Sequence, residues 1–345
     1  MNLSDFQYDL PAGAIAQEPI NPRDHSRLLV LDRKSKTIVH KRFFDLVEFL
    51  RPGDLLVTNA TKVFPARLRG KKVSGGKIEV LLLESRSADS KLWRALVRGA
   101  TQSTALVFPE NLTATMDQRL EEGEWLVNFS HDSLRSYLEK HGEMPLPPYI
   151  KRPAPQASDL DRYQTVYAEK EGAVAAPTAG FHFTPQLLEA IHAKGITVRP
   201  VVLHVGWGTF RPVRTEKIED HKMLSETYEV SEVLARELNQ ARQEGRRIIA
   251  VGTTVVRTLE TVYGQGNKFH SGRGESNLFI YPGYKFKAVD ALITNFHLPD
   301  STPLLLACAF YGGTPSTPFS LRSAYEEAIK EGYRFYSYGD AMFIQ

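Results

Sequence analysis

The chain has 345 residues and a formal net charge of +3, with 42% hydrophobic and 24% charged residues, which is ordinary for a soluble globular protein. No stretch approaches the roughly 18 apolar residues of a membrane span, the first residues lack the apolar centre of a secretory signal, and one cysteine, Cys308, excludes an internal disulfide or a cysteine-based zinc site. We therefore expect a cytoplasmic protein with two domains, or one large domain with an insertion.

The first sixty residues predict a small mixed unit. Strands are expected over 28–31 and 37–40, a short helix over 43–50, and a further strand over 55–58.

The pattern then changes. Short apolar runs at 78–83, 93–97, 105–108 and 125–129 are separated by glycine, serine or acidic turns, and no helical periodicity lies between them. Several short strands without helices indicate a compact β-barrel or sandwich. A helix capped by Asp132 and a stiff segment with three prolines end this region.

The same region begins with an excess of positive charge. Residues 1–100 hold 18 Lys and Arg against 11 Asp and Glu, and the rest of the chain has more acids than bases. Six basic residues fall within sixteen positions: Lys62, Arg67, Arg69, Lys71, Lys72 and Lys77. Nucleic-acid phosphates are the commonest partner of such a cluster, although a solvated face gives the same pattern.

Strands and helices alternate after residue 184. Helices are expected over 185–194, 231–245, 303–310 and 321–331, and strands over 197–203, 247–251, 289–294 and 333–336. Continuous apolar strands between helices favour a covered, largely parallel sheet. We therefore predict an α/β body, a layered sheet with helices, from residues 1–61 and 152–345, with a small β-barrel domain inserted at 62–151.

Four loops next to these elements could carry chemistry: 175–184, 203–210, 251–257 and 294–299. Open α/β sheets bind ligands at the carboxyl ends of their strands. The turn Gly252-Thr253-Thr254 joins a strand to a helix, and both an anion site and a plain connection fit it. It lacks the lysine and glycines of nucleotide motifs. A fifth segment, 219–226, combines acids with an imidazole.

The first of these loops is rich in small residues. Pro177 and Gly180 exclude a regular helix and let the backbone approach a ligand closely, and Thr184 with Pro185 starts a helix just after His182. A binding site and a tight connection with a satisfied histidine both fit this segment.

The residues alone leave several functions open. One is an enzyme that moves protons with histidine and carboxylate, holds an anion at residues 252–254 and recruits nucleic acid through the basic segment. Another is a metal-dependent hydrolase using His182, His204, His221 and Asp220 or Asp290, although no paired-histidine spacing supports it. A nucleic-acid-binding module without catalysis would not need four polar loops at one sheet edge.

Together these segments resemble the S-adenosylmethionine:tRNA ribosyltransferase-isomerases of queuosine biosynthesis. The resemblance runs nearly end to end and is carried by residues 27–29, 53–57, 65–68, 75–80, 144–150, 163–167, 173–184, 204–210, 251–260, 290–299 and 337–343. It implies a two-domain monomer that moves the ribosyl group of S-adenosylmethionine onto an aminomethyl-deazaguanine wobble base of tRNA. The product is epoxyqueuosine-tRNA, and adenine and methionine leave. S-adenosylmethionine is a consumed substrate, and neither a cofactor nor a metal is implied.

The resemblance and the chemistry together suggest a set of site residues. Proton transfer is assigned to His182, His204, Asp220, His221, Glu226 and His297, without choosing the base. Substrate binding is assigned to Thr178, Gly180, Phe181, Gly206, Trp207, Gly252, Thr253, Thr254, Arg257 and Asn295, with the sulfonium on the aromatic face of Trp207 or Phe181 and the carboxylate at the helix start or Arg257. Binding of tRNA is assigned to Lys62, Arg67, Arg69, Lys71 and Lys72.

Two positions depart from the family pattern. Leu224 stands where family members usually have a second histidine, three positions after His221, and Val255 stands where a polar residue is usual.

Overall fold

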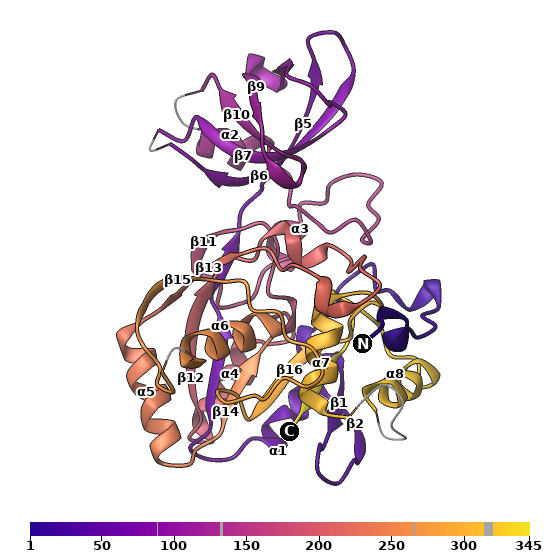
Figure 1. The fold of residues 1–345 in the computed structure, drawn as a ribbon, viewed down its shortest axis with the longest axis vertical. Helices are drawn as coiled ribbons and strands as arrows, with labels where there is room; N and C mark the ends of the chain where they lie inside the picture. Colours follow the sequence, from indigo (N-terminus) through magenta and orange to yellow (C-terminus); the bar gives the residue numbers. More distant parts are fainter. Residues whose placement is uncertain (88, 132–133, 265, 314–319) are drawn as a thin grey trace.

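Nine strands form a mixed sheet through the body of the protein, seen in a computed structural model that describes residues 1–87, 89–131, 134–264, 266–313 and 320–345 (Figure 1). In sheet order these strands are β15 (Gly272–Ser276), β13 (Glu226–Val230), β12 (Thr197–Leu203), β3 (Leu55–Asn59), β14 (Ile248–Val251), β16 (Ala291–Asn295), β17 (Ala341–Ile344), β1 (Arg27–Leu31) and β2 (Ile38–Arg42). The central strands β12, β3, β14 and β16 run parallel, so their carboxyl ends meet at one edge.

Helices cover both faces of this sheet, as the alternation of buried strand residues requires. One face packs on α5 (Glu232–Gln243), α6 (Thr253–Gly264), α7 (Thr302–Tyr311) and α8 (Leu321–Lys330). The other face packs on α1 (Leu46–Phe49) and α4 (Pro185–Ala193). Thr184 and Ser231 cap α4 and α5, each hydroxyl accepting from the amide three residues on. Among the described residues, none of the helices combines the length and the apolar character that a bilayer-spanning segment requires.

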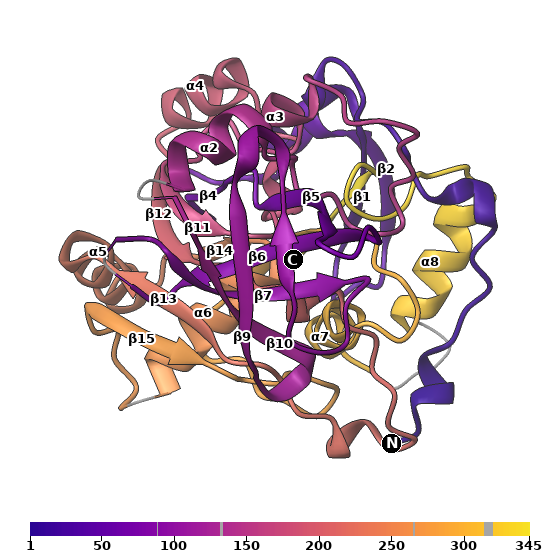
Figure 2. The ribbon, with the colours of Figure 1, turned by 90° about the horizontal axis from the view of Figure 1, so that it is seen from above.

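Six antiparallel strands close into a barrel that stands on one end of the body and lies over the sheet when viewed from above (Figures 1 and 2). Around the barrel they are β10 (Glu124–Phe129), β7 (Leu92–Arg98), β6 (Lys77–Ser85), β5 (Arg67–Lys72), β8 (Ala105–Val107) and β9 (Thr113–Arg119). Helix α2 (Leu134–His141) packs on its core. The predicted fold class, an α/β body with a small barrel, is confirmed. The exact boundaries at 62 and 151 stay a prediction.

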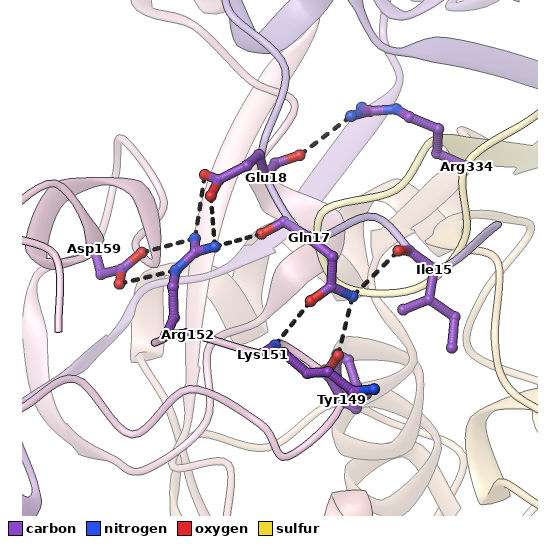
Figure 3. A network of polar contacts seen from close by, with 8 residues as sticks. All are labelled: Ile15, Gln17, Glu18, Tyr149, Lys151, Arg152, Asp159 and Arg334. Carbon is purple, nitrogen blue, oxygen red and sulfur yellow. Dashed lines mark hydrogen bonds and ion pairs between the residues drawn. The ribbon is translucent and has the colours of Figure 1, made fainter. Parts of the chain in front are cut away.

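Two short strands and a polar network lie where the chain passes between body and barrel. On the way out, β4 (Thr61–Val63) pairs in parallel with β11 (Lys170–Ala173). On the way back, the side chain of Gln17 contacts the backbone of Tyr149 and Lys151, and Arg152 pairs with Glu18 and Asp159 (Figure 3). The Arg152–Glu18 pair and the contacts of Gln17 thus fix the returning segment to the N-terminal part of the body, and the buried Arg152–Asp159 pair holds the guanidinium in place.

Some sequence expectations were wrong. A largely parallel sheet was expected, but four of the eight pairings in the sheet are antiparallel. The expected strand over 333–336 is irregular chain with one isolated bridge at Phe335, and the strand that enters the sheet after it is β17, which lies between β16 and β1. The remaining short helices are α3 (Asp159–Arg162) and nine 3₁₀ turns, including η7 (Thr178–Gly180), η8 (Trp207–Phe210) and η9 (Ile218–Asp220), among the described residues. The expected cap Asp132 lies outside the described residues.

Candidate active site between the barrel and the sheet

A cavity of about 920 Å³ lies between the barrel and the body. Its barrel wall includes Leu83, Trp93 and Glu124, and its body wall includes His204 and Trp207. Eight glutamates and three arginines are among the described lining residues: Glu84, Glu121, Glu122, Glu124, Glu139, Glu171, Glu226, Glu275, Arg86, Arg94 and Arg135. Each arginine is already paired with a glutamate that also lines the cavity. The cavity therefore favours cationic ligands and disfavours phosphate.

His204 forms part of the wall of this cavity just after β12. Its Nδ1 lies 3.0 Å from the hydroxyl oxygen of Thr61, and burial, with Lys170 nearby, lowers the pKa of the imidazole. Gly172, with φ of +148°, lies against the ring, and a Cβ there would be 2.6 Å from its Nδ1 and Cε1. A glycine on β11 is therefore required for the imidazole to hold this position.

Glu226 joins three elements at the back of the same cavity. One carboxylate oxygen accepts from the amide of Gly206 at 2.9 Å, and the other pairs with Arg257 of α6. The other two nitrogens of the Arg257 guanidinium donate to the carbonyls of Ser276 and Leu278. All three nitrogens of the Arg257 guanidinium are thus engaged by the protein, which favours the helix start as the candidate site for a substrate carboxylate.

A smaller cavity, of about 60 Å³, lies at the carboxyl edge of the parallel strands. Loops from distant parts of the sequence meet there, and the lining includes Thr178, Val205, Gly252, Thr253, Thr254, Asn295 and His297. Val205 also lines the large cavity, so the two adjoin. The prediction that strand-end loops gather at one edge is confirmed for these residues.

The start of α6 has the features of an anion site. Gly252 turns the chain with φ of +96°, and the first helical amides point out of the helix without intrahelical acceptors. The hydroxyl of Thr254, which is 93% buried, has no hydrogen-bond partner in the protein although it lines the small cavity. A buried hydroxyl without a partner is costly, and a bound anion would satisfy it.

Two buried histidines lie behind the small cavity. His297 lines it and has its Nε2 2.8 Å from the hydroxyl of Thr294. His182 is not among the lining residues of the large or the small cavity, and its ring nitrogens are 2.7 Å from the Ser26 hydroxyl and 3.1 Å from the Asn295 amide nitrogen. Burial lowers the pKa of both imidazoles to about 3. Both rings are therefore neutral near pH 7.

His182 contacts the small cavity only through another side chain. The side chain of Asn295 contacts His182 on one side and accepts from the hydroxyl of Thr178 at 3.0 Å on the other. The satisfied-histidine interpretation of this loop thus fits the geometry, and we assign His182 a positioning role.

Other predicted site residues lie apart from the cavities. Asp220 is exposed on η9, and His221 packs edge-on against Phe279, its pKa lowered by burial and by Arg211. Phe181 is buried against Tyr163 and Tyr338. A Cβ on Gly180 would lie 2.1 Å from the hydroxyl of Tyr167, so this glycine serves packing. Asp220 and His221 stay predictions that the geometry does not bring to the site.

The two departures from the family pattern have different surroundings. Leu224 lines the large cavity, and its Cδ1 would lie 2.7 Å from a Cβ on Gly208. Val255 is fully buried in the core beneath the sheet. The first departure therefore places an apolar group in the cavity wall, and the second changes only the core.

The described residues contain no group of three or more histidines, cysteines, aspartates or glutamates arranged to hold a metal ion. The metal-dependent hydrolase interpretation thus has no site among them.

The chain belongs to the queuosine biosynthesis protein family, whose pattern it matches over residues 3–344. It is 50% identical to the S-adenosylmethionine:tRNA ribosyltransferase-isomerases of Moorella thermoacetica and of Thermotoga petrophila, and each alignment covers 100% of both chains. It is also similar to the crystal structure of the S-adenosylmethionine tRNA ribosyltransferase of Thermotoga maritima, with a TM-score of 0.56, 39% identity and coverage of 99% of this chain and 100% of the other.

The two buried histidines predict a pH dependence of stability. The unfolded chain binds protons at these imidazoles below about pH 6.5, but the folded chain does so only near pH 3, so the free energy of unfolding falls as the pH decreases through this window, by about 1.4 kcal/mol per pH unit and histidine. Urea unfolding between pH 7 and 5 measures the slope. His297→Gln should lower this slope by the contribution of one proton, whereas His192→Gln, at an exposed position, should leave it unchanged. Equal slopes for His297→Gln and the wild type would contradict the account.

The contact between Gly172 and His204 predicts a second outcome. Gly172→Ala should push the imidazole away from Thr61 and move the pKa of His204 back toward its ordinary value, which proton NMR of the ring measures. The matched control is Gly272→Ala, because Gly272 has a similar φ of +136° with nothing near its Cβ position. This control carries only backbone strain, of order 1–3 kcal/mol. If both variants shift the pKa of His204 alike, the contact is not what holds the ring.

Proposed function

We propose that this protein transfers and isomerises the ribosyl moiety of S-adenosylmethionine onto the aminomethyl-deazaguanine wobble base of tRNA, giving epoxyqueuosine-tRNA with release of adenine and methionine. The observation that carries the proposal is full-length membership of the family, with relatives of this activity at 50% identity. S-adenosylmethionine is the consumed substrate, with no resident cofactor or metal. We place the reaction in the cytoplasm, on a monomer.

The two adjoining cavities fit the two ends of S-adenosylmethionine. Its carboxylate suits the amides at the start of α6, where the Thr254 hydroxyl lacks a partner. Its sulfonium is a cation and suits the acid-lined large cavity, where Trp207 supplies an aromatic face worth about 0.5–2 kcal/mol. Phe181, the other aromatic considered, is committed to the core.

The same acidic wall also suits the second substrate. The aminomethyl group has an amine reference pKa of ~10.4 and arrives as a cation that must lose a proton before it attacks. Carboxylates in the wall attract the cationic form of the amine. They repel the phosphates that flank the base, so these phosphates are expected to bind on the outside of the barrel.

His204 is our choice for the residue that removes a proton from the ribose methylene beside sulfur. It lines the large cavity, it is only half-buried, and its lowered pKa keeps it neutral and able to accept a proton. His297 has a pKa of about 3 and is a weaker acceptor, while Glu226 is paired with Arg257. We assign these two to positioning the substrate.

Single-turnover adenine release tests the function and the base together. Labelled S-adenosylmethionine and an anticodon stem-loop carrying the precursor base should yield adenine only when both are present. His204→Gln should slow this release by about 10²–10⁴-fold, because general-base catalysis is worth that much. His192→Gln, on an exposed helix position, is the control. A retained methylthio-nucleoside would contradict the proposed function. A normal rate for His204→Gln would show that His204 is not the base.

The predicted tRNA-binding residues differ in availability. Lys71 lies exposed and Lys72 half-buried at the end of β5, and Lys62 is exposed on β4. Arg69 is exposed but paired with Glu143. Arg67 is half-buried and donates to the carbonyl of Leu146 at 2.8 Å, so it serves the barrel itself. We propose that the end of β5 contacts the tRNA backbone.

A triple variant, Arg69→Ala with Lys71→Ala and Lys72→Ala, should bind tRNA more weakly. Each lost phosphate contact lowers the slope of log K against log salt by about 0.7–0.9. Filter binding at several salt concentrations measures it. Replacing three exposed lysines of the body, Lys34, Lys285 and Lys330, removes the same charge elsewhere and should change the slope little. Equal slopes for the two triple variants would contradict a specific contact at β5.

A further inference from the structure

Glu124 is a buried carboxylate that the barrel contributes to the cavity wall. It is the first residue of β10, only 5% exposed, and it lines the large cavity beside residues of the body. Such a group must be paired, because an unpaired buried charge is costly.

Both oxygens of Glu124 are engaged. Arg94 on the neighbouring strand β7 donates its Nε to one oxygen at 2.8 Å and a terminal nitrogen to the other at 3.0 Å. The indole nitrogen of Trp207 donates to the second of these oxygens at 2.9 Å. A carboxylate held by a two-point arginine pair is neutralised and oriented, so it is suited to positioning and not to proton abstraction.

The bond to Trp207 crosses from barrel to body. Trp207 belongs to η8, which follows β12 in the body, yet its ring packs against the core of the barrel. The ring already accepts one cation, since the guanidinium of Arg211 lies 5.2 Å from its centroid. Arg211 in turn pairs with Glu122, two residues before Glu124. An indole with its N–H fixed at one point and its edge packed at another has a defined plane.

We propose that Glu124 is a positioning residue for the sulfonium: it fixes the Trp207 ring at the cavity wall in the orientation that receives the cation of S-adenosylmethionine. This inference rests on the proposed function. It makes the cation site a joint property of the two domains, because the ring comes from the body and the group that orients it comes from the barrel.

Two ligands that differ only at the sulfur can separate a role toward the sulfonium from a purely structural role. S-adenosylhomocysteine lacks the S-methyl group and is a neutral thioether, so it shares every contact except those of the sulfonium. Calorimetry of the full chain with each ligand gives the ratio of their dissociation constants. Glu124→Ala should weaken S-adenosylmethionine by about two- to thirtyfold, the range of a cation–π contact, and leave S-adenosylhomocysteine nearly unchanged. A purely structural role would weaken both ligands alike.

Further variants complete the experiment, and the first of them, Trp207→Ala, removes the aromatic face and should lower the ratio by itself. Glu124→Gln keeps an oxygen that can accept from the indole, so it should retain most of the ratio of the two dissociation constants. This variant also keeps the test valid if Glu124→Ala folds poorly. Trp207→Phe removes the donor, so adding Glu124→Ala to it should cause no further loss. Gln17→Ala breaks other contacts between the two domains, with the backbone of Tyr149 and Lys151, away from the large cavity, and should leave the ratio unchanged.

The outcomes separate the inference from the proposed function. A ratio lowered by Trp207→Ala but untouched by Glu124→Ala and Glu124→Gln would overturn the role of Glu124 alone. A ratio untouched by Trp207→Ala would place the sulfonium elsewhere and overturn the whole inference, whereas the proposed function itself would be overturned only if the wild-type chain released no adenine in the single-turnover assay.

Discussion

The buried ion pair between Glu226 and Arg257 is the constraint on which the site depends. It ties strand β13 to helix α6, and through the amide of Gly206 it also fixes the loop after β12. The start of α6 forms the small cavity and the loop after β12 forms the body wall of the large one. Removing either partner would leave a buried charge unpaired, at a cost of about 3–5 kcal/mol.

The two domains contribute different chemical groups to the site. The body supplies rigid strand ends with neutral histidines and an anion site, and the barrel supplies most of the carboxylates of the large cavity. Cationic groups are therefore favoured inside, while exposed lysines at the end of β5 are left for phosphates outside. A sulfonium donor and an aminomethyl base both match an acidic interior.

Much of this could be predicted from the sequence because the patterns are local. Apolar strands followed by Gly or His turns predicted the three loops at the carboxyl edge, and Thr184 and Ser231 predicted helix starts. The strands β5, β9 and β13 were missed because they carry many polar residues and no continuous apolar run. The roles of Gly172 and Glu124 could not be predicted, because each depends on a partner more than 30 residues away, and no periodicity reports such a contact. His182 looked catalytic in sequence, but its buried partners are apparent only in three dimensions.

A crystal structure of the full chain soaked with S-adenosylmethionine tests the central claim most directly. The account predicts the carboxylate of the ligand at the amides of residues 253–255, with its sulfonium within about 6 Å of the Trp207 ring centroid. A ligand bound with its carboxylate among the glutamates of the large cavity, or outside both cavities, would contradict it.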